Sequence, residues 1–201
     1  MANQVLLYIS AASDLKHERE VLGRTAAEIP VSLGWRIVQS PVGDVPVDLD
    51  AVSRADVHLL LLGGDIRAPI GVEWVAARRA GRPTLLFLKQ RVLRTPAAQD
   101  FVRYVGGVEA WQPFTDAADL KMRVLGLLVD HILERADYFA LLPVELVRLR
   151  GWRSGLEGSP SVTEDEPRGG IGEGGVILSP DRYVPSDGVL IQPREEKEGQ
   201  S

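Results

Sequence analysis

Glu73 is the residue of this chain best placed to do chemistry. It falls in the first turn of a helix predicted over about 71–80, which follows an aliphatic strand predicted over 57–62. The N-terminal end of a helix favours an ionised carboxylate. Such a carboxylate beside a ligand can stabilise an oxocarbenium-like transition state or attack an anomeric carbon. Glutamates are also common in first turns for the dipole reason alone, so a purely structural role stays open.

Ser10 and Asp14 follow the first predicted strand, and their side chains are of the types that hold ribose through its hydroxyls. The small residues Ala11 and Ala12 lie between them and would let a ligand approach the backbone, while the helix that follows offers free amide groups. The alternative is that Ser13 or Asp14 caps that helix. In that case the charged side chains that follow would lie in solvent: Glu18, Arg19 and Glu20.

Two further residues near Glu73 are candidate ligand contacts. Asp65 lies in the short loop 64–69, and Trp74 could stack on a base. A tryptophan beside a helix start is more commonly a packing residue. His58 falls within a predicted strand, which favours a hydrogen-bonded core residue. No metal site is expected, because the histidines have no metal-ligand spacing to one another: His17, His58 and His131.

Strands and helices alternate along the chain. Apolar runs predict strands over 5–10, 35–39, 57–62, 84–88 and 110–114. Helical patterns are predicted over about 13–29, 50–55, 71–80, 95–105 and 116–135. Because the strands are apolar on both faces, helices should cover both sides of an open, doubly wound parallel sheet of the α/β class. We expect about five strands in flavodoxin-like order, with ligands outside their carboxyl ends.

The domain organisation changes after this alternation ends. We predict an α/β domain over 1–136, a helical segment over 137–154 and a flexible, acidic, Gly/Pro-rich tail over 155–201. Within the tail, the pattern Gly-Val-aliphatic-aliphatic-polar-Pro occurs at 175–180 and again at 188–193. These segments predict a hairpin, or two docking strands for a protein partner, unless the repeat is a coincidence of low-complexity sequence.

Composition and charge narrow the function classes. The net charge of −5 arises in the last 51 residues, which hold ten acidic and five basic residues, so the rest is neutral and nucleic-acid binding is not expected. The chain has no cysteine, which excludes disulfides, thiolate zinc sites and cysteine nucleophiles. The first apolar run is too short for a signal peptide or a membrane span. We therefore expect a soluble, cytoplasmic protein with no membrane partner.

The opening segment resembles the signature of an uncharacterised family, domain of unknown function 4062. That signature reads Phe-Ile-Ser-Ser-Thr, two residues, Asp-Leu, two residues, then Glu-Arg-Glu. The matching positions in this chain are Ile9, Ser10, Asp14, Leu15, Glu18, Arg19 and Glu20. The insert between Ser10 and Asp14 is one residue shorter than in that pattern, and Ala11-Ala12 replace the usual Ser-Thr.

The family is similar to TIR domains and nucleoside 2-deoxyribosyltransferases. Their catalytic glutamate lies in the pattern Glu, three residues, Ala, three residues, Gly-Lys, then a strand. Here the corresponding residues are Glu73, Ala77, Gly81, Arg82 and the predicted strand 84–88. The resemblance covers roughly residues 5–136. Gly71 stands where the family often carries a second acid.

The resemblance implies one of two functions. As an enzyme, the protein would cleave or transfer at the N-glycosidic bond of NAD, a nucleoside or a nucleotide. Glu73 would be the catalytic carboxylate, Ser10 and Asp14 would hold ribose or its phosphate, and no cofactor would be needed. As a module without turnover, it would bind a nucleotide or another TIR-like domain, while the tail recruits a partner. Bacterial stress or defence signalling is suggested for either role by analogy of fold alone.

Overall fold

A computed structural model describes residues 4–40, 45–67 and 69–157 of the chain. The strands are β1 (Gln4–Ala11), β2 (Gly34–Gln39), β3 (Val57–Leu62), β4 (Thr84–Lys89) and β5 (Gln112–Phe114). The helices are α1 (Lys16–Thr25), α2 (Leu49–Arg54), α3 (Ile70–Arg79), α4 (Pro96–Gly106), α5 (Ala117–Glu134) and α6 (Pro143–Glu157). Short 3-10 turns precede and follow α1, at Ser13–Leu15 and Ala26–Glu28. The repeated segments at 175–180 and 188–193 lie outside the described residues.

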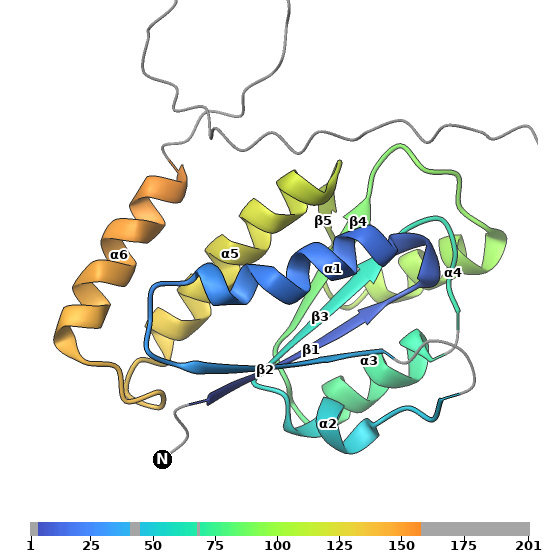
Figure 1. Ribbon diagram of the computed structural model, residues 1–201. Helices are drawn as coiled ribbons and strands as arrows, with labels where there is room; N and C mark the ends of the chain where they lie inside the picture. The colour runs from blue at the N-terminus through green and yellow to red at the C-terminus, as the bar shows by residue number, and fades with distance from the viewer. Residues whose placement is uncertain (1–3, 41–44, 68, 158–201) are drawn as a thin grey trace, which may run out of the picture. The chain divides into compact units, whose positions relative to one another are not determined.

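The strands of the described residues form one sheet in which every pairing is parallel (Figure 1). Their order is β2-β1-β3-β4-β5, which confirms the predicted α/β class and flavodoxin-like topology. Tyr8 of β1 pairs with Val38 of β2 and with His58 of β3. The carboxyl ends of β1, β2 and β3 therefore meet at one edge, where a doubly wound sheet places its ligands.

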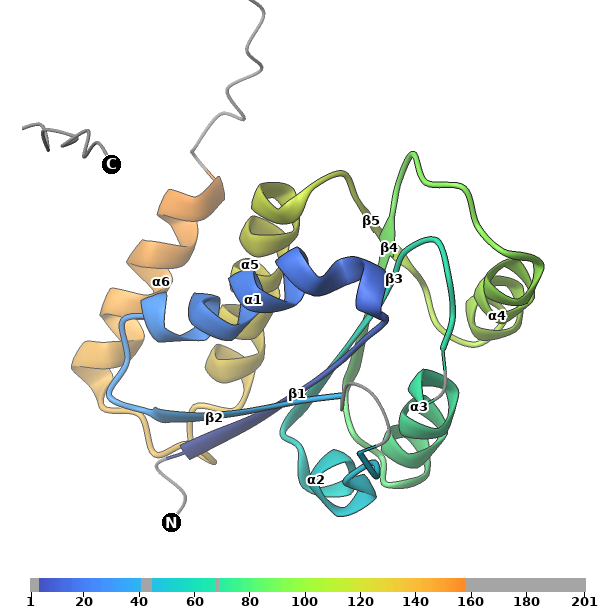
Figure 2. The ribbon, with the colours of Figure 1, turned by 45° about the vertical axis from the view of Figure 1, so that its right-hand side comes forward.

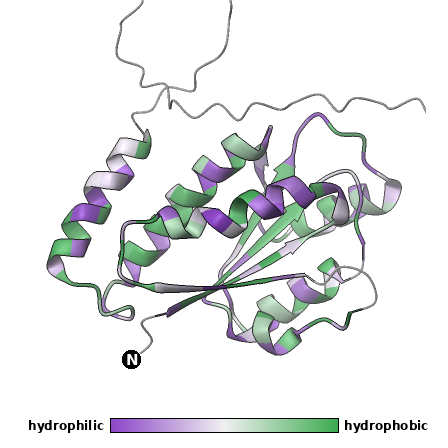
Figure 3. Cartoon of the chain, in the orientation of Figure 1, coloured by the Kyte–Doolittle hydropathy of each residue, from purple (hydrophilic) through white to green (hydrophobic). Residues whose placement is uncertain are grey.

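Helices cover both faces of the sheet. Figures 1 and 2 show α1 and α5 along one face, with α6 beyond them, and α2, α3 and α4 on the opposite side. Side chains alternate along β1, so Leu7 and Ile9 join the core under α1 and α5, whereas Tyr8 faces α2 and α3. Figure 3 shows hydrophobic residues interspersed with hydrophilic ones along α5 and a more hydrophilic α1.

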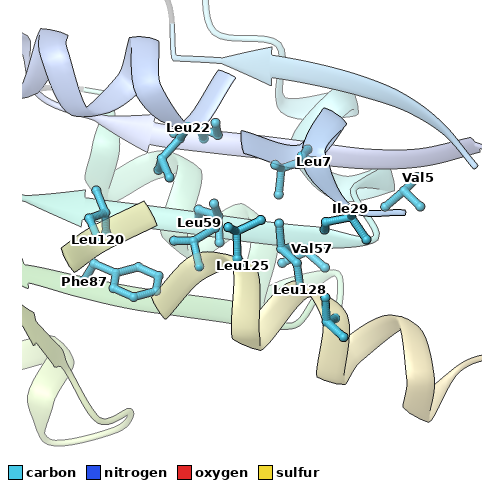
Figure 4. Packing of buried hydrophobic residues seen from close by; sticks show 14 of the residues in the cluster. Val5, Leu7, Leu22, Ile29, Val57, Leu59, Phe87, Leu120, Leu125 and Leu128 are labelled. Carbon is cyan, nitrogen blue, oxygen red and sulfur yellow. The ribbon is translucent and has the colours of Figure 1, made fainter. Parts of the chain in front are cut away.

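The larger core lies between the sheet and the α1–α5 layer (Figure 4). Leu7, Leu59 and Phe87 reach it from three strands, Leu22 from α1 and Leu128 from α5, and all five are buried. Truncating one such leucine to alanine typically costs 2–5 kcal/mol. Because this core holds the strands in place, it also fixes where the loops at the carboxyl edge of the sheet begin.

The helical segment predicted after the α/β domain is present, and α6 begins at Pro143. Proline suits the first turn of a helix because it lacks the N–H that would be unpaired there. Glu145 ties this helix to the turn before β2: its Oε1 accepts hydrogen bonds from the Ser32 backbone N–H at 2.9 Å and hydroxyl at 2.6 Å. Arg153 pairs with Asp130 of α5 at 2.9 Å. These contacts hold α6 against the turn before β2 and against α5.

Among residues 4–40, 45–67 and 69–157, no helix combines the length and the apolar character needed to cross a membrane.

Candidate active site

The Glu73 carboxylate lies inside the protein, where β1, β2 and α3 meet. The residue has no exposed surface. Its Oε1 accepts a hydrogen bond from the Tyr8 hydroxyl at 2.7 Å, and its Oε2 accepts one from the Ser40 hydroxyl at 2.6 Å. Tyr8 belongs to β1, and Ser40 directly follows β2. A single carboxylate at the start of α3 therefore joins three elements at the carboxyl edge of the sheet.

Tyr8 is a hydrogen-bond donor in this pair. Burial raises the pKa of its phenol well above the ordinary value, and the hydrogen bond to Glu73 and the charge of Glu73 raise that pKa further. The phenol therefore keeps its proton at neutral pH. Since a buried acceptor left without a partner is costly, the two hydroxyls contribute to holding Glu73 in place.

Ser10 lies two residues beyond Tyr8 on the same face of β1, and its hydroxyl lies 2.8 Å from His58 Nε2. Burial lowers the pKa of His58 to about 4, so the ring is neutral near pH 7. The other ring nitrogen, Nδ1, lies 3.4 Å from the Thr84 hydroxyl. No carboxylate of the described residues bonds to this ring, so the pair lacks the acid of a Ser-His-Asp triad. His58 is the hydrogen-bonded core residue that the sequence predicts.

Asp14 and Asp65 both lie at the loop that follows β3, which contains Gly64 and Asp65 itself. Asp14 Oδ2 accepts a hydrogen bond from the Gly64 N–H at 2.8 Å, and Asp65 Oδ1 accepts one from the Thr95 hydroxyl at 2.9 Å. No hydrogen bond within the described residues joins either carboxylate to Glu73. The structure thus brings these two acids to the same loop, and their contact with a ligand stays a prediction.

The predicted helix cap after β1 is wrong. Neither the 3-10 turn at Ser13–Leu15 nor α1 has a side-chain cap. The Asp14 carboxylate instead accepts a hydrogen bond from the Gly64 amide, because the segment after β1 packs close to the loop after β3.

Trp74 follows Glu73 on α3 but faces α4. Its indole is buried, lies edge-on to Phe101 and Tyr104 at ring distances of 6.1 and 5.7 Å, and has the Arg78 guanidinium 5.0 Å from its centre. Protein groups therefore surround this ring in the packing between α3 and α4. Stacking on a base stays a prediction.

The alternative that Glu18 and Arg19 are solvated is wrong. Glu18 is 4% exposed and pairs with Lys89 at the end of β4, with 2.6 Å between Oε1 and Nζ. Arg19 is 8% exposed, and its Nη2 donates to the Ser40 carbonyl at 2.8 Å and to Gln39 Oε1 at 3.1 Å. A charged side chain can be buried when a polar or oppositely charged group contacts it. Here those groups lie at the ends of β2 and β4, so the local sequence around Glu18 and Arg19 does not reveal them.

Two hollows lie near these elements. One, of about 340 Å³, is at the carboxyl end of β2 beside the start of α1; its lining residues are Ser13, Lys16, Arg19, Glu20 and Gln39. The other, of about 410 Å³, is a mainly apolar groove between α2 and α3 that includes Leu49, Val72 and Arg79. Only the first contains a residue bonded to Ser40, the partner of Glu73.

The residues that sequence reasoning missed are Tyr8 and Ser40. A signal for each was present: Tyr8 shares the face of Ser10 on the predicted first strand, and Ser40 directly follows the second. No group of three or more metal-binding side chains of the usual types occurs in the described ranges. No family model, no curated protein and no solved structure matches this chain.

Proposed function

We propose that the protein is a TIR-like or nucleoside deoxyribosyltransferase-like domain that acts on the N-glycosidic bond of NAD, a nucleoside or a nucleotide. The observation that carries this proposal is the Glu73 carboxylate at the first turn of α3, oriented by the hydroxyls of Tyr8 and Ser40. It lies at the sheet edge where doubly wound folds bind ligands. A carboxylate held in one orientation is the group that glycosidic chemistry requires.

In the proposed reaction, Glu73 faces C1′ of the ribose. As the C1′–N bond breaks, the bonding electron pair leaves with the base, and positive charge develops on the sugar ring. The carboxylate stabilises this charge or forms a covalent ester at C1′. Water then attacks C1′, which breaks the ester bond where one has formed, and gives its proton to the Glu73 carboxylate or to solvent, so that the free sugar is released. In the transfer reaction a second base attacks C1′ instead and releases Glu73 in the same way. Nicotinamide leaves as a neutral base, whereas other bases need protonation.

The proposal requires that a ligand can reach the Glu73 carboxylate. Glu73 is fully buried and both its oxygens accept hydrogen bonds. A ribose hydroxyl could replace the hydroxyl of Ser40 as donor, which would keep the carboxylate satisfied when the ligand enters. The Tyr8 bond would then hold the other oxygen in place.

The burial of Glu73 supports a second candidate, a module of the same fold that binds without turnover. A carboxylate that joins β1, β2 and α3 contributes to stability whether or not it reacts. In this role the domain would bind a nucleotide or another TIR-like domain, such as a second copy of this chain, in stress or defence signalling. The two candidates differ in whether base is released.

The test compares the full chain with its Glu73→Gln variant. Each is incubated at high protein concentration with NAD and with a panel of nucleosides and nucleotides, and free base is measured by chromatography. We expect release by the unmodified protein and a loss of roughly a hundredfold or more in the variant, because the charge on the carboxylate is removed. Glu134→Gln, which changes an exposed acid on α5, should retain full activity.

Absence of base release from the unmodified protein on every substrate would overturn the glycosidic role and leave the binding module. Turnover by Glu73→Gln at the unmodified rate would place the chemistry elsewhere. Because Glu73 is buried and bonded, the variant also loses stability, by about 1–3 kcal/mol. Urea unfolding must therefore show that it is folded at the assay temperature.

A further inference from the structure

Arg19 is a buried cation without an anionic partner. It is 8% exposed, and no ion pair joins it to a carboxylate within the described parts of the chain. Its two side-chain hydrogen bonds within the described residues go to neutral oxygens, the Ser40 carbonyl and Gln39 Oε1, and both are made by Nη2. Burying a charge without a counter-charge is costly. The neighbouring Glu18 is also buried, but it forms an ion pair with Lys89, whereas Arg19 forms no ion pair within the described residues.

The remaining N–H groups of Arg19 are free to bind a ligand. Its Nε and Nη1 make no hydrogen bond with the described residues, yet neither is among the enclosed polar atoms that lack a partner. They are therefore not fully enclosed, and Arg19 lines the hollow of about 340 Å³. Because Nη2 is bonded to Ser40 and Gln39, Nε and Nη1 can each donate a single charge-assisted hydrogen bond to an anion such as a phosphate.

The other lining residues suit an anion. Ser13 and Gln39 supply a hydroxyl and an amide, and Lys16 supplies a second positive charge. Glu20 also lines the hollow, and its carboxylate lies 3.9 Å from Lys16 Nζ, with both side chains largely exposed. The charges therefore sum to about +1, most of it held by the buried Arg19.

The hollow is connected to Glu73 through one residue. Ser40 accepts a hydrogen bond from Arg19 through its carbonyl and donates one to Glu73 through its hydroxyl. A phosphate on Arg19 would thus lie one residue away from the carboxylate. A ligand that spans both positions carries its phosphate next to a sugar, as a nucleotide does.

We propose that Arg19 and the hollow beside it bind the phosphate of a nucleotide, so that the ligand of the Glu73 site is a nucleotide or dinucleotide and not a free nucleoside. This inference rests on the proposed function for the position of the sugar. Arg19 is the specificity-determining residue, since the phosphate is what separates the two ligand classes.

The experiment measures binding by calorimetry, using the full chain with Glu73→Gln so that the ligand is not consumed. The probes are adenosine, adenosine 5′-monophosphate, NAD and inorganic phosphate. We expect at least one of the two nucleotides to bind roughly tenfold or more tightly than adenosine and than inorganic phosphate. Its affinity should fall with added salt, because the contact is ionic.

Adding Arg19→Met should remove this preference and leave adenosine binding within about twofold. A merely structural role for Arg19, which also holds the end of β2, would instead weaken both ligand classes alike. Arg24→Met is the matched control: Arg24 is an exposed cation of the same helix that does not line the hollow, so its loss should leave the affinity within about twofold. Should Arg19→Met fail to fold, the nucleotide preference and its salt dependence in the parent protein still decide the matter.

Equal affinity for adenosine and both nucleotides would overturn the inference, as would a preference that survives Arg19→Met. Nucleotide binding no tighter than that of inorganic phosphate would show a site for free anions and overturn it as well. Failure of the proposed function is visible separately. In that case the unmodified protein releases no base, while the Arg19-dependent preference for nucleotides remains.

Discussion

The Tyr8 hydroxyl donates a hydrogen bond of 2.7 Å to Glu73 Oε1, and the two residues are 65 positions apart in the chain. This bond fastens α3 to the middle of β1 beneath the carboxyl edge of the sheet. Both partners are fully buried, so the bond forms where solvent cannot replace it. The orientation of the carboxylate therefore depends on the phenol.

Tyr8→Phe removes that donor and leaves a buried acceptor unsatisfied. We expect the free energy of unfolding in urea to fall by about 1–3 kcal/mol. Tyr104→Phe is the matched control, because this residue is 65% exposed and its change should cost less than about 0.5 kcal/mol. Combining Tyr8→Phe with Glu73→Gln should cost less than the sum of the two changes. Equal effects of the two tyrosine changes would contradict the importance of the bond.

Gly63 makes room for the Asp14 carboxylate. A Cβ at this position would collide with Asp14 Oδ2 and lie 3.1 Å from Leu15 Cδ2. We expect Gly63→Ala to lower stability by about 1–3 kcal/mol, as overpacking does. In an Asp14→Ala background the penalty should shrink, because the colliding group is gone.

Gly151→Ala is the control for the Gly63 prediction. Nothing lies within 4 Å of a Cβ at this position of α6, so alanine should raise stability by roughly 0.5–1 kcal/mol through its helix propensity. Thermal and urea unfolding measure both glycine variants. An undiminished cost of Gly63→Ala without Asp14 would show that the collision is not with that carboxylate.

His58 should make the protein less stable in mild acid. Burial lowers its pKa from 6.5 to about 4, so the unfolded chain binds a proton that the folded chain excludes. Its contribution is therefore complete above about pH 6.5 and is lost as the pH falls towards 4. We expect about 2 kcal/mol less stability at pH 5 than at pH 6.5, measured by urea unfolding.

His58→Gln should flatten this pH dependence. His131 acts in the same direction, because burial and then the charge of Arg135 lower its pKa, so His131→Gln serves to measure its separate share. An unchanged slope in His58→Gln would show that the imidazole is not the group responsible.

Several features of the fold were predictable because their causes are local. Runs such as 57–62 are apolar on both faces, and only burial between two helical layers accommodates them. The placement of Glu73 in the first turn of a helix follows from the strand before it and the helical pattern after it. Element ends were less predictable: the last strand is shorter than the run 110–114, and α6 starts at Pro143.

The sequence by itself determined the parallel α/β sheet and the carboxylate at its edge, since hydrophobic period and chain order decide both. Only the tertiary structure decided what each polar group bonds. The Asp14 carboxylate accepts a hydrogen bond from the Gly64 amide instead of capping its own helix, and Arg19 donates one to the Ser40 carbonyl. Tyr8 donates to Glu73 across 65 positions of chain. The reason is physical: a buried polar group bonds whichever partner the packed elements bring within about 3 Å, and that partner can lie anywhere in the sequence.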